Sequence, residues 1–501
     1  MRRIAALAVA AFCVIGSLAL SSVPANAAGP TILGAGSTWS QIAIDQWRTD
    51  VVSQGLSINY QGVGSTQGRA FFIGNSVDFA VSEIPFQSDE LPTLNRKFKY
   101  LPIVAGGTSM MYNVKDAAGN QIRNLKLSPS TIAGIFLGHI TSWSDRAVTK
   151  DYGKQLPNTP IKVIVRSDGS GTSAQFSAYL NAMQHSAWAA FARHCKQPGA
   201  PYTQFWPYGP QCYPNNNAIG QRGSDGVANY IANPGLGVGA IGYVEAGYAI
   251  ERNFPVVAVQ NRSGAFVYPT AHNVATALSH ARIHADSTQD LSQVYTAPEK
   301  TAYPISSYSY MIVPTDNSIT PDKGAVLGKF IIYFACTGQQ AAERLGYSPM
   351  PKALVGFAFA AEKQIPGAPA PPPLTGSACP NPTLTGEFWN DGQTTTTVGG
   401  SGPVDETDTG GPTASVAPSV AASVDPRADK SERRSSGGET ITQTASPEVL
   451  SPESLAALKK IADARILGLQ PGSPLSLVVI AGLVLILVFG PLLLRMRHRE
   501  G

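Results

Sequence analysis

Charged residues are scarce in this chain of 501 residues. Asp, Glu, Lys and Arg make up only 14% of it, and the formal net charge is +4. Nucleic-acid-binding domains typically carry a strongly basic patch or stripe. Because this balance is nearly even, we expect no nucleic acid as a partner. The low charge, together with many Gly, Ser, Thr and Pro residues, is typical of an exported protein with neutral loops.

Two catalytic or cofactor signatures are incomplete. The glycine-rich run at residues 34–36 lacks the third glycine of a dinucleotide fingerprint, which argues against a nicotinamide cofactor. Ser170 stands between two glycines, but residues 169–171 do not form the Gly-x-Ser-x-Gly turn of a hydrolase. No His–Asp partner can be assigned to Ser170. We therefore expect no catalytic residues and no cofactor.

The histidine pattern also falls short of a metal site. His280 and His284 are four residues apart, a spacing that places two side chains on one helical face. A zinc-protease helix needs Glu directly after the first histidine, and Ala281 stands there. We interpret the pair as part of a solvated helix face and expect no metal.

The first 27 residues have the pattern of a secretory signal peptide. Arg2 and Arg3 form the basic start, residues 4–20 form the apolar stretch, and residues 25–27 (ANA) fit the small-residue cleavage rule. We predict cleavage after Ala27. Cys13 would leave with this peptide, and the bulky Phe12 before it argues against a lipoprotein anchor.

The sequence has five cysteines, so four remain after the loss of Cys13. An even number of cysteines outside the cytoplasm indicates disulfides, and three pairings are possible. We favour Cys195–Cys212 and Cys336–Cys379, because each closes a local loop. The second bridge would fasten the start of the C-terminal tail to the domain. Free buried thiols are the alternative.

The C-terminal part of the chain differs in composition from the rest. Residues 367–450 are rich in Pro, Gly, Ser and Thr, with too little apolar surface to form a core, and they predict a disordered linker. Residues 452–466 predict a short amphipathic helix. Residues 475–494 carry no charge and are long enough to cross a membrane as a helix.

Three arginines follow this apolar segment, within residues 495–501. Positive charge beside a membrane span indicates the cytoplasmic side. The chain is therefore predicted to be a single-pass protein of the cell membrane, with a basic cytoplasmic tail and its N-terminal domain outside the cytoplasm. A buried helix of a soluble domain is the alternative for residues 475–494, and its position after a linker argues against it.

Strand-like and helix-like runs alternate from residue 29 to about residue 366. This alternation predicts an α/β fold with a parallel sheet. The expected strands are residues 31–33, 57–60, 77–81 and 162–165, and the expected helices are residues 39–53, 67–73 and 170–184.

Three segments rich in glycine and hydroxyl side chains each follow a strand-like run and precede a helix-like one. They are residues 34–38 (GAGST), 62–66 (GVGST) and 166–172 (RSDGSGT). A helix start exposes unpaired N–H groups and the positive end of the helix dipole. Glycine lets the backbone approach a ligand closely, and hydroxyls add hydrogen bonds. The three segments therefore predict a binding site for a small oxyanion at the carboxyl ends of the strands.

At these segments the chain resembles the periplasmic phosphate-binding proteins, the substrate-binding subunits of phosphate ABC importers. The resemblance covers about residues 31–356. It rests on the order of many short fragments, among them LGAGST at 33–38, NYQGVGS at 59–65, VRSDGSGTS at 165–173, DGVA at 225–228, GAIGYVE at 239–245 and GQQAA at 338–342.

The resemblance implies a two-lobe periplasmic-binding-protein-like fold of type II, with a hinge, over residues 28–366. One lobe would comprise about residues 29–104 and 303–366, and the other about residues 105–302. The chain would cross between the lobes near residues 106–107 and 303–304. Inorganic phosphate would bind between the lobes, and no enzymatic activity is expected.

The resemblance also implies the residues that contact phosphate: Thr38, Ser65, Glu83, Arg166, Ser170, Gly171 and Thr172. Asp168 would orient the Arg166 guanidinium from behind. Glu83 stands where the family usually has Asp, and its carboxylate can accept the proton that phosphate carries and sulfate lacks. Its extra C–C bond, about 1.5 Å long, requires a rotamer change or a loop shift.

The predicted function is extracytoplasmic binding of phosphate and its delivery to ABC permease subunits. The alternative is a membrane-anchored surface anion sensor or adhesion module with the same fold and no role in transport. A phosphoryl hydrolase is a third reading, which the missing metal cluster and missing base disfavour.

Overall fold

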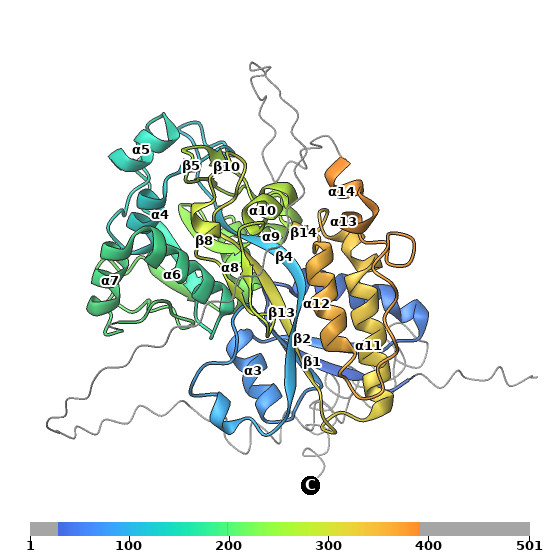
Figure 1. Cartoon of the computed structure of the whole chain (residues 1–501). Coiled ribbons are helices and arrows are strands. Elements are labelled where there is room, and N and C mark those ends of the chain that lie inside the picture. Colours follow the sequence, from blue (N-terminus) through green and yellow to red (C-terminus); the bar gives the residue numbers. More distant parts are fainter. Residues whose placement is uncertain (1–28, 198, 391–501) are drawn as a thin grey trace, which may run out of the picture. The chain divides into compact units, whose positions relative to one another are not determined.

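The strand β4 (Phe98–Tyr112) belongs to both halves of the main sheet. The structure is a computed structural model that describes residues 29–390 except residue 198. Residues of β4 up to Gly107 pair with β13 (Ser306–Pro314), and those from Thr108 onward pair with β8 (Ala240–Glu245). One continuous strand therefore links two sets of strands, and it lies with β13 in the middle of the part of the chain that the structure describes (Figure 1).

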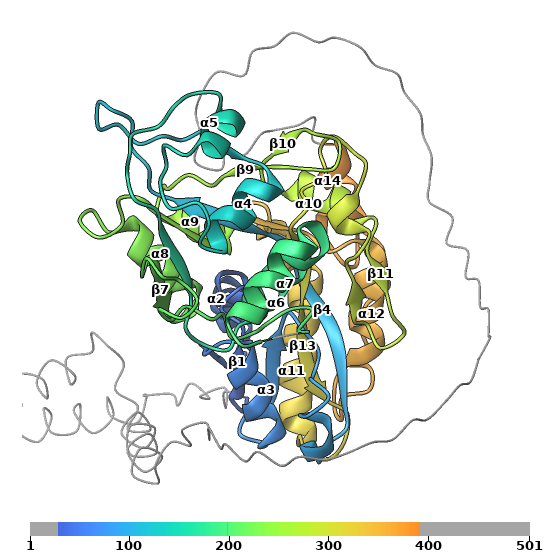
Figure 2. The same ribbon diagram turned by 90° about the vertical axis from the view of Figure 1, so that its left-hand side faces the viewer.

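The strands of the main sheet follow the order β2-β1-β3-β13-β4-β8-β6-β7, and the short β14 (Tyr347–Ser348) also pairs with β4. We call β2, β1, β3, β13 and residues 98–107 of β4 the first half-sheet. The remainder of β4 with β8, β6 and β7 is the second half-sheet. Both halves have helices packed against them (Figures 1 and 2).

The first half-sheet confirms the predicted alternation of strands and helices. Its elements run in the order β1 (Ile32–Gly36), α2 (Gln41–Asp50), β2 (Ile58–Gly62), α3 (Ser65–Ile73) and β3 (Phe79–Ser82). β1 pairs in parallel with both β2 and β3, as predicted. The carboxyl ends of the three strands therefore share one edge of the sheet. The helices α11 (Pro321–Ala335) and α12 (Lys352–Glu362) lie side by side against this half (Figure 1).

The second half-sheet repeats this arrangement. β6 (Lys162–Arg166) pairs in parallel with β7 (Ala218–Gln221) and β8, and α6 (Gly171–Met183) follows β6 after a short loop. Further helices of this part are α4 (Pro129–Phe136), α5 (Arg146–Tyr152), α7 (His185–His194), α8 (Gly223–Ala232), α9 (Ala246–Glu251) and α10 (Ala271–Leu278).

Short elements complete the described chain. Two small sheets contain β5 (Lys126–Leu127), β9 (Ala258–Gln260) and β10 (Phe266–Val267) in one, and β11 (Arg282–Ile283) and β12 (Gln289–Asp290) in the other. The 3-10 turns are η1 (Val51–Gln54), η2 (Leu91–Thr93), η3 (Val294–Thr296) and η4 (Thr337–Ala341). The last helices are α13 (Pro382–Thr385) and α14 (Glu387–Asn390).

The strands at the centre of the main sheet are antiparallel, whereas the sequence predicted a parallel sheet. β13 runs antiparallel to β3 and β4, and β4 runs antiparallel to β8. β4 passes through residues 106–107 without a break, where the predicted first crossing between lobes lies. The carboxyl ends of β1 and β6 consequently face a common region between the two half-sheets.

Buried tryptophans fill the core beside this region. Trp39 and Trp47 are buried in the first part of the chain, and Trp143, Trp188 and Trp206 in the middle part. The Trp39 indole N–H donates to Thr108 Oγ1 over 3.3 Å, and that of Trp47 donates to the Gly338 carbonyl over 2.9 Å. Because a buried indole N–H needs an acceptor, these bonds tie the segment just before the start of α2 to β4 and α2 itself to η4.

Both favoured disulfides, Cys195–Cys212 and Cys336–Cys379, are present. Cys379 is fully buried, and the buried Asn381 donates to the carbonyls of Ala335 and Met350, each over 3.1 Å. The predicted start of the linker at residue 367 is therefore too early, since the chain stays packed on the domain as far as Phe388, which is buried and stacks on His272. Residues 367–390 are ordered despite their many Pro and Gly residues, because a disulfide and buried hydrogen bonds attach them to the domain.

Several predicted segments lie outside the described residues. They are the signal peptide at residues 1–27, the linker after residue 390, the helix at 452–466, the apolar segment at 475–494 and the tail at 495–501. Within residues 29–390, the gap at 198 apart, no helix has the length and apolar character that a membrane span requires.

The prediction that His280 and His284 lie on one face of a helix is wrong. The helix α10 ends at Leu278, and the chain then turns into β11. His280 Nε2 lies 2.9 Å from both carboxylate oxygens of Glu299. The two histidines thus do not share a helical face.

Candidate functional site

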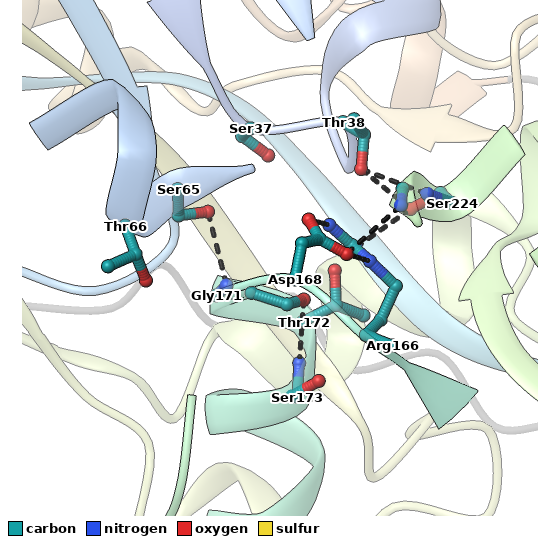
Figure 3. A network of polar contacts seen from close by, with 12 residues as sticks. Ser37, Thr38, Ser65, Thr66, Arg166, Asp168, Gly171, Thr172, Ser173 and Ser224 are labelled. Atoms are coloured by element: carbon teal, nitrogen blue, oxygen red, sulfur yellow. Dashed lines mark hydrogen bonds and ion pairs between the residues drawn. The ribbon is translucent and has the colours of Figure 1, made fainter. Parts of the chain in front are cut away.

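The three predicted oxyanion loops meet between the half-sheets (Figure 3). The Gly171 N–H donates to Ser65 Oγ over 3.1 Å, and the Thr66 N–H donates to the Gly169 carbonyl over 3.3 Å. From the other side, the Ser224 N–H donates to Thr38 Oγ1 over 3.0 Å. The site therefore gathers groups that are far apart in the sequence, and both halves of the sheet contribute to it.

Two glycines allow this close approach. Gly64 precedes α3 with a φ of 92°, and a Cβ on it would lie 2.4 Å from Asp168 Oδ2. A Cβ on Gly171 would lie 2.3 Å from Glu83 Oε2 and 2.8 Å from Ser65 Oγ. Real Cβ atoms do not come so close to oxygens, and an L side chain rarely adopts a φ near 90°. Glycine is required at both positions for the loops to meet.

The start of α6 supplies the backbone donors of the third loop. Ser170 caps this helix, and its Oγ accepts a hydrogen bond from the Ser173 N–H over 3.1 Å. The Ser170 N–H itself donates to the Gln204 carbonyl over 2.9 Å. The first N–H groups of a helix have no partner within the helix. Gly171 and Thr172 therefore bring the positive end of the α6 dipole to the site, where the Gly171 N–H donates to Ser65 Oγ.

Arg166 is the cation of this site, and Asp168 holds it. The guanidinium is almost completely buried, Nε donates to Asp168 Oδ1 over 2.7 Å, and Nη2 contacts Asp168 Oδ2. Nη1 lies 3.4 Å from Ser224 Oγ. Burial alone would lower the pKa of Arg166, but the hydrogen bonds and charge of Asp168 raise it. Arg166 therefore keeps its positive charge inside the protein.

The same pairing acts on Asp168 in the opposite direction. Burial would raise the pKa of Asp168, but the hydrogen bonds and charge of Arg166, with a further bond from the Gly223 N–H, hold it below its usual value. The pair is ionised at neutral pH. The contact agrees with the orienting role that the resemblance implied for Asp168.

Glu83 is buried where the loops meet and is not solvent-exposed. Its Oε1 contacts Ser37 Oγ and accepts from Ser309 Oγ over 2.9 Å, and its Oε2 accepts from Ser65 Oγ over 2.8 Å. Burial raises the pKa of Glu83, while these three hydroxyls and the charge of Arg166 oppose that rise. The carboxylate is thus an acceptor placed among hydroxyl donors, directly beside the start of α6.

The predicted phosphate contacts and the predicted orienting residue all lie in this region. They are Thr38, Ser65, Glu83, Arg166, Asp168, Ser170, Gly171 and Thr172. Sequence reasoning missed Ser37, Ser224, Ser309 and Glu245. Ser37 lies inside the first loop, and Ser224 follows β7, so their position after a strand was a usable signal. Ser309 lies within β13 with no local motif, and only the fold brings it to Glu83.

Tyr248 adds a contact between the halves of the sheet. Its hydroxyl on α9 donates to the Thr38 carbonyl over 2.6 Å. This bond fixes the backbone just before α2. The completed region offers backbone N–H groups, hydroxyls and one guanidinium around buried carboxylates, which is a donor set suited to a small tetrahedral oxyanion that carries a proton.

Comparison with known proteins agrees with this geometry. A family model described as a PBP superfamily domain matches residues 21–337. The chain is 32% identical over 327 residues to the phosphate-binding protein PstS of Xylella fastidiosa, which covers 65% of this chain and 82% of that protein. The chain belongs to the phosphate-binding protein family. A second member, PstS of Haemophilus influenzae, is 31% identical over 340 residues, covering 68% of this chain and 94% of that protein.

Solved structures show the same fold. The ancestral soluble variant of the human phosphate binding protein superposes with a TM-score of 0.51 at 21% identity, covering 68% of this chain and all (100%) of that chain. A human phosphate binding apolipoprotein gives a TM-score of 0.50 at 22% identity, with coverage of 66% and 93%. The α/β periplasmic-binding-protein-like fold expected of the family is therefore confirmed.

Proposed function

We propose that this phosphate-binding family member binds inorganic phosphate outside the cytoplasm and delivers it to a phosphate ABC importer. The observation that carries the proposal is the buried Arg166 guanidinium, held by Asp168 where three hydroxyl-rich loops converge. A planar guanidinium matches a tetrahedral oxyanion with two parallel hydrogen bonds. The names of the related PstS proteins support the same ligand.

The proposed ligands of phosphate are Thr38, Ser65, Glu83, Arg166, Ser170, Gly171 and Thr172, with Ser37 and Ser224 beside them. A hydrogen bond to a charged group contributes about 1.5–3 kcal/mol net. Several such bonds together can replace the hydration of the anion. Glu83 gives the selectivity, since protonated phosphate can donate to it while sulfate meets only a buried negative group.

Binding would close the two lobes around the anion. Contacts such as Ser65 with Gly171 and Thr38 with Ser224 join the half-sheets, so the anion would be held from both sides only when the lobes are closed. A ligand shifts a conformational equilibrium by its difference in affinity for the two states. Phosphate therefore favours the closed form, which is the form proposed to dock on the permease.

The sequence pattern supplies the proposed location. The predicted signal peptide would export the binding domain, and the apolar segment at residues 475–494 would hold it at the membrane by a single span with a cytoplasmic C-terminus. The linker between them would let the domain reach permease subunits in the same membrane. A binding protein of this kind needs no catalytic residue.

Two measurements separate binding from transport. Equilibrium dialysis of the purified mature chain with radiolabelled phosphate tests binding, and the proposal expects saturable uptake of one phosphate per chain. Deletion of the gene should then reduce phosphate import by intact cells. Saturable binding with unchanged import, in cells that have no second copy of the gene, would instead favour a surface sensor or adhesion module of the same fold.

A further inference from the structure

Glu245 is a second buried carboxyl at the edge of the site, and no ligand role follows from the motifs. It is the last residue of β8, directly before α9, and its side chain is fully buried. Its Oε1 lies 3.3 Å from Thr172 Oγ1, while Oε2 has no hydrogen-bond partner among the described residues. Burying an ionised carboxylate with an unpaired oxygen is costly. The neutral acid avoids most of that cost.

The charged and titratable groups around Glu245 come from four other places in the fold. Arg166 at the end of β6 attracts its negative charge, and Glu83 after β3 repels it. Tyr248 on α9 and Tyr347 on β14 also lie close enough to interact with it, and burial raises the pKa of both tyrosines well above 10, so they are neutral. Arg166 is already paired with Asp168, and little positive charge remains to stabilise Glu245 as an anion.

The direction of the hydrogen bond between Thr172 and Glu245 determines whether the Thr172 hydroxyl can donate to a bound anion. A hydroxyl has one hydrogen to donate. If Glu245 is ionised, Thr172 donates to it and turns an oxygen lone pair toward any anion bound at the site. If Glu245 is protonated, its O–H donates to Thr172 Oγ1, and the Thr172 hydrogen is free to reach the anion. The Ser224 hydroxyl, which opposes the rise in the pKa of Glu245, faces the same choice.

We propose that Glu245 is a positioning residue that is protonated in the phosphate-bound state and donates a hydrogen bond to Thr172. A Glu245 that is ionised before binding must therefore take up one proton when phosphate binds. The inference rests on the proposed function of the site as a phosphate receptor. No covalent bond changes in this step, since the proton comes from solvent and stays on Glu245 until phosphate leaves.

The surroundings of Glu245 in this structure favour the acid form near neutral pH. Burial raises the pKa of Glu245 to about 8, and the charge of Glu83 adds to this, while hydrogen bonds and Arg166 oppose it. Phosphate adds negative charge nearby and raises this pKa further. Glu245 is then mostly protonated before binding at pH 7 and mostly ionised at pH 9. Phosphate affinity falls as pH rises through this range, up to tenfold per pH unit from this group.

The test compares wild-type protein, Glu245→Gln and the control Glu251→Gln by titration with inorganic phosphate at pH 7 and pH 9. Glu251 lies on α9 with a largely exposed side chain, outside the site. A glutamine at 245 can donate to Thr172 at any pH. For each protein, the Kd for phosphate at pH 9 is divided by the Kd at pH 7. This ratio should be at least fivefold smaller for Glu245→Gln than for wild type or Glu251→Gln. Because phosphate titrates identically in all three, the comparison isolates residue 245.

A second measurement does not depend on a variant. Calorimetry of wild-type protein with phosphate at pH 8.5, in buffers of different ionisation enthalpy, counts the protons exchanged, and the proposal expects net uptake after subtraction of the protons that phosphate itself exchanges. A net uptake of zero protons would overturn the role of Glu245. So would a Glu245→Gln protein that folds but binds phosphate more than tenfold more weakly than wild type at pH 7. A wild-type protein that binds no phosphate at pH 7 would instead refute the proposed function.

Discussion

Arg166 and Glu83 show what single residues in the site could and could not reveal from the sequence. Arg166 opens one of the three glycine-rich loops that predicted an oxyanion site, and the family resemblance gave it the role of the cation. Glu83 could be placed only through the family resemblance, and its bonds to Ser37 and Ser65 join parts of the chain that local patterns treat separately. Ser309 reaches the same carboxylate from 226 residues away. Only the register of β13 on β3 creates that contact.

Arg166→Lys tests the geometry of the cation at the residue scale. The ammonium keeps the charge but loses the planar fork that contacts Asp168 and the anion together. Phosphate affinity should fall by 10- to 100-fold, which corresponds to about 1.5–3 kcal/mol. Titration calorimetry measures it, with Arg48→Lys on the exposed face of α2 as the control. Unchanged affinity in Arg166→Lys would place the guanidinium outside the binding interaction.

The elements of the site were predictable because each has a strong local signal. The helix expected at residues 170–184 is α6 at Gly171–Met183, and the parallel strands β1, β2 and β3 appear where the alternation of apolar runs put them. The antiparallel strands β4 and β13 were not foreseen, because strand direction depends on which distant segments pair. The packed path of residues 367–390 was also missed, since a disulfide and buried Asn381 hold residues of low apolar content.

Gly171→Ala tests the contact between two elements, the start of α6 and the loop that carries Glu83. The added Cβ would lie 2.3 Å from Glu83 Oε2, so the carboxylate or the helix must move. Phosphate affinity should fall at least tenfold, while the variant stays folded. Gly226→Ala on α8 is the matched control, because the nearest atom to its Cβ is an ordinary 3.7 Å away. Equal affinities in the two variants would show that Gly171 does not approach Glu83.

At the scale of the whole molecule, the side chain of Gln204 is one of those that link the two half-sheets. Gln204 lies in the loop closed by Cys195–Cys212, and its Oε1 accepts from Thr66 Oγ1 over 2.5 Å and from Arg69 Nη2 over 2.7 Å. Both donors belong to α3 of the first half-sheet. These bonds can form only while the two parts are in contact. They therefore stabilise the closed state relative to an open one.

Gln204→Ala should accelerate phosphate release without removing any contact to the anion. Loss of two hydrogen bonds, each contributing about 0.5–1.5 kcal/mol, predicts an about 5- to 160-fold faster dissociation rate and a nearly unchanged association rate. Stopped-flow mixing measures both rates. Gln197→Ala is the control, because the Gln197 side chain lies on the same disulfide loop and donates to the Phe205 carbonyl over 3.5 Å. A slower association rate with unchanged dissociation would contradict the closure role of Gln204.

The most direct test of the account is titration calorimetry of the purified chain, first with phosphate and then with sulfate at equal concentration. A buried Arg166 with Glu83 as proton acceptor predicts a saturable heat with one phosphate per chain and no binding heat with sulfate. A chain that gives no heat with phosphate, or that binds both anions equally, would contradict the assignment of this site.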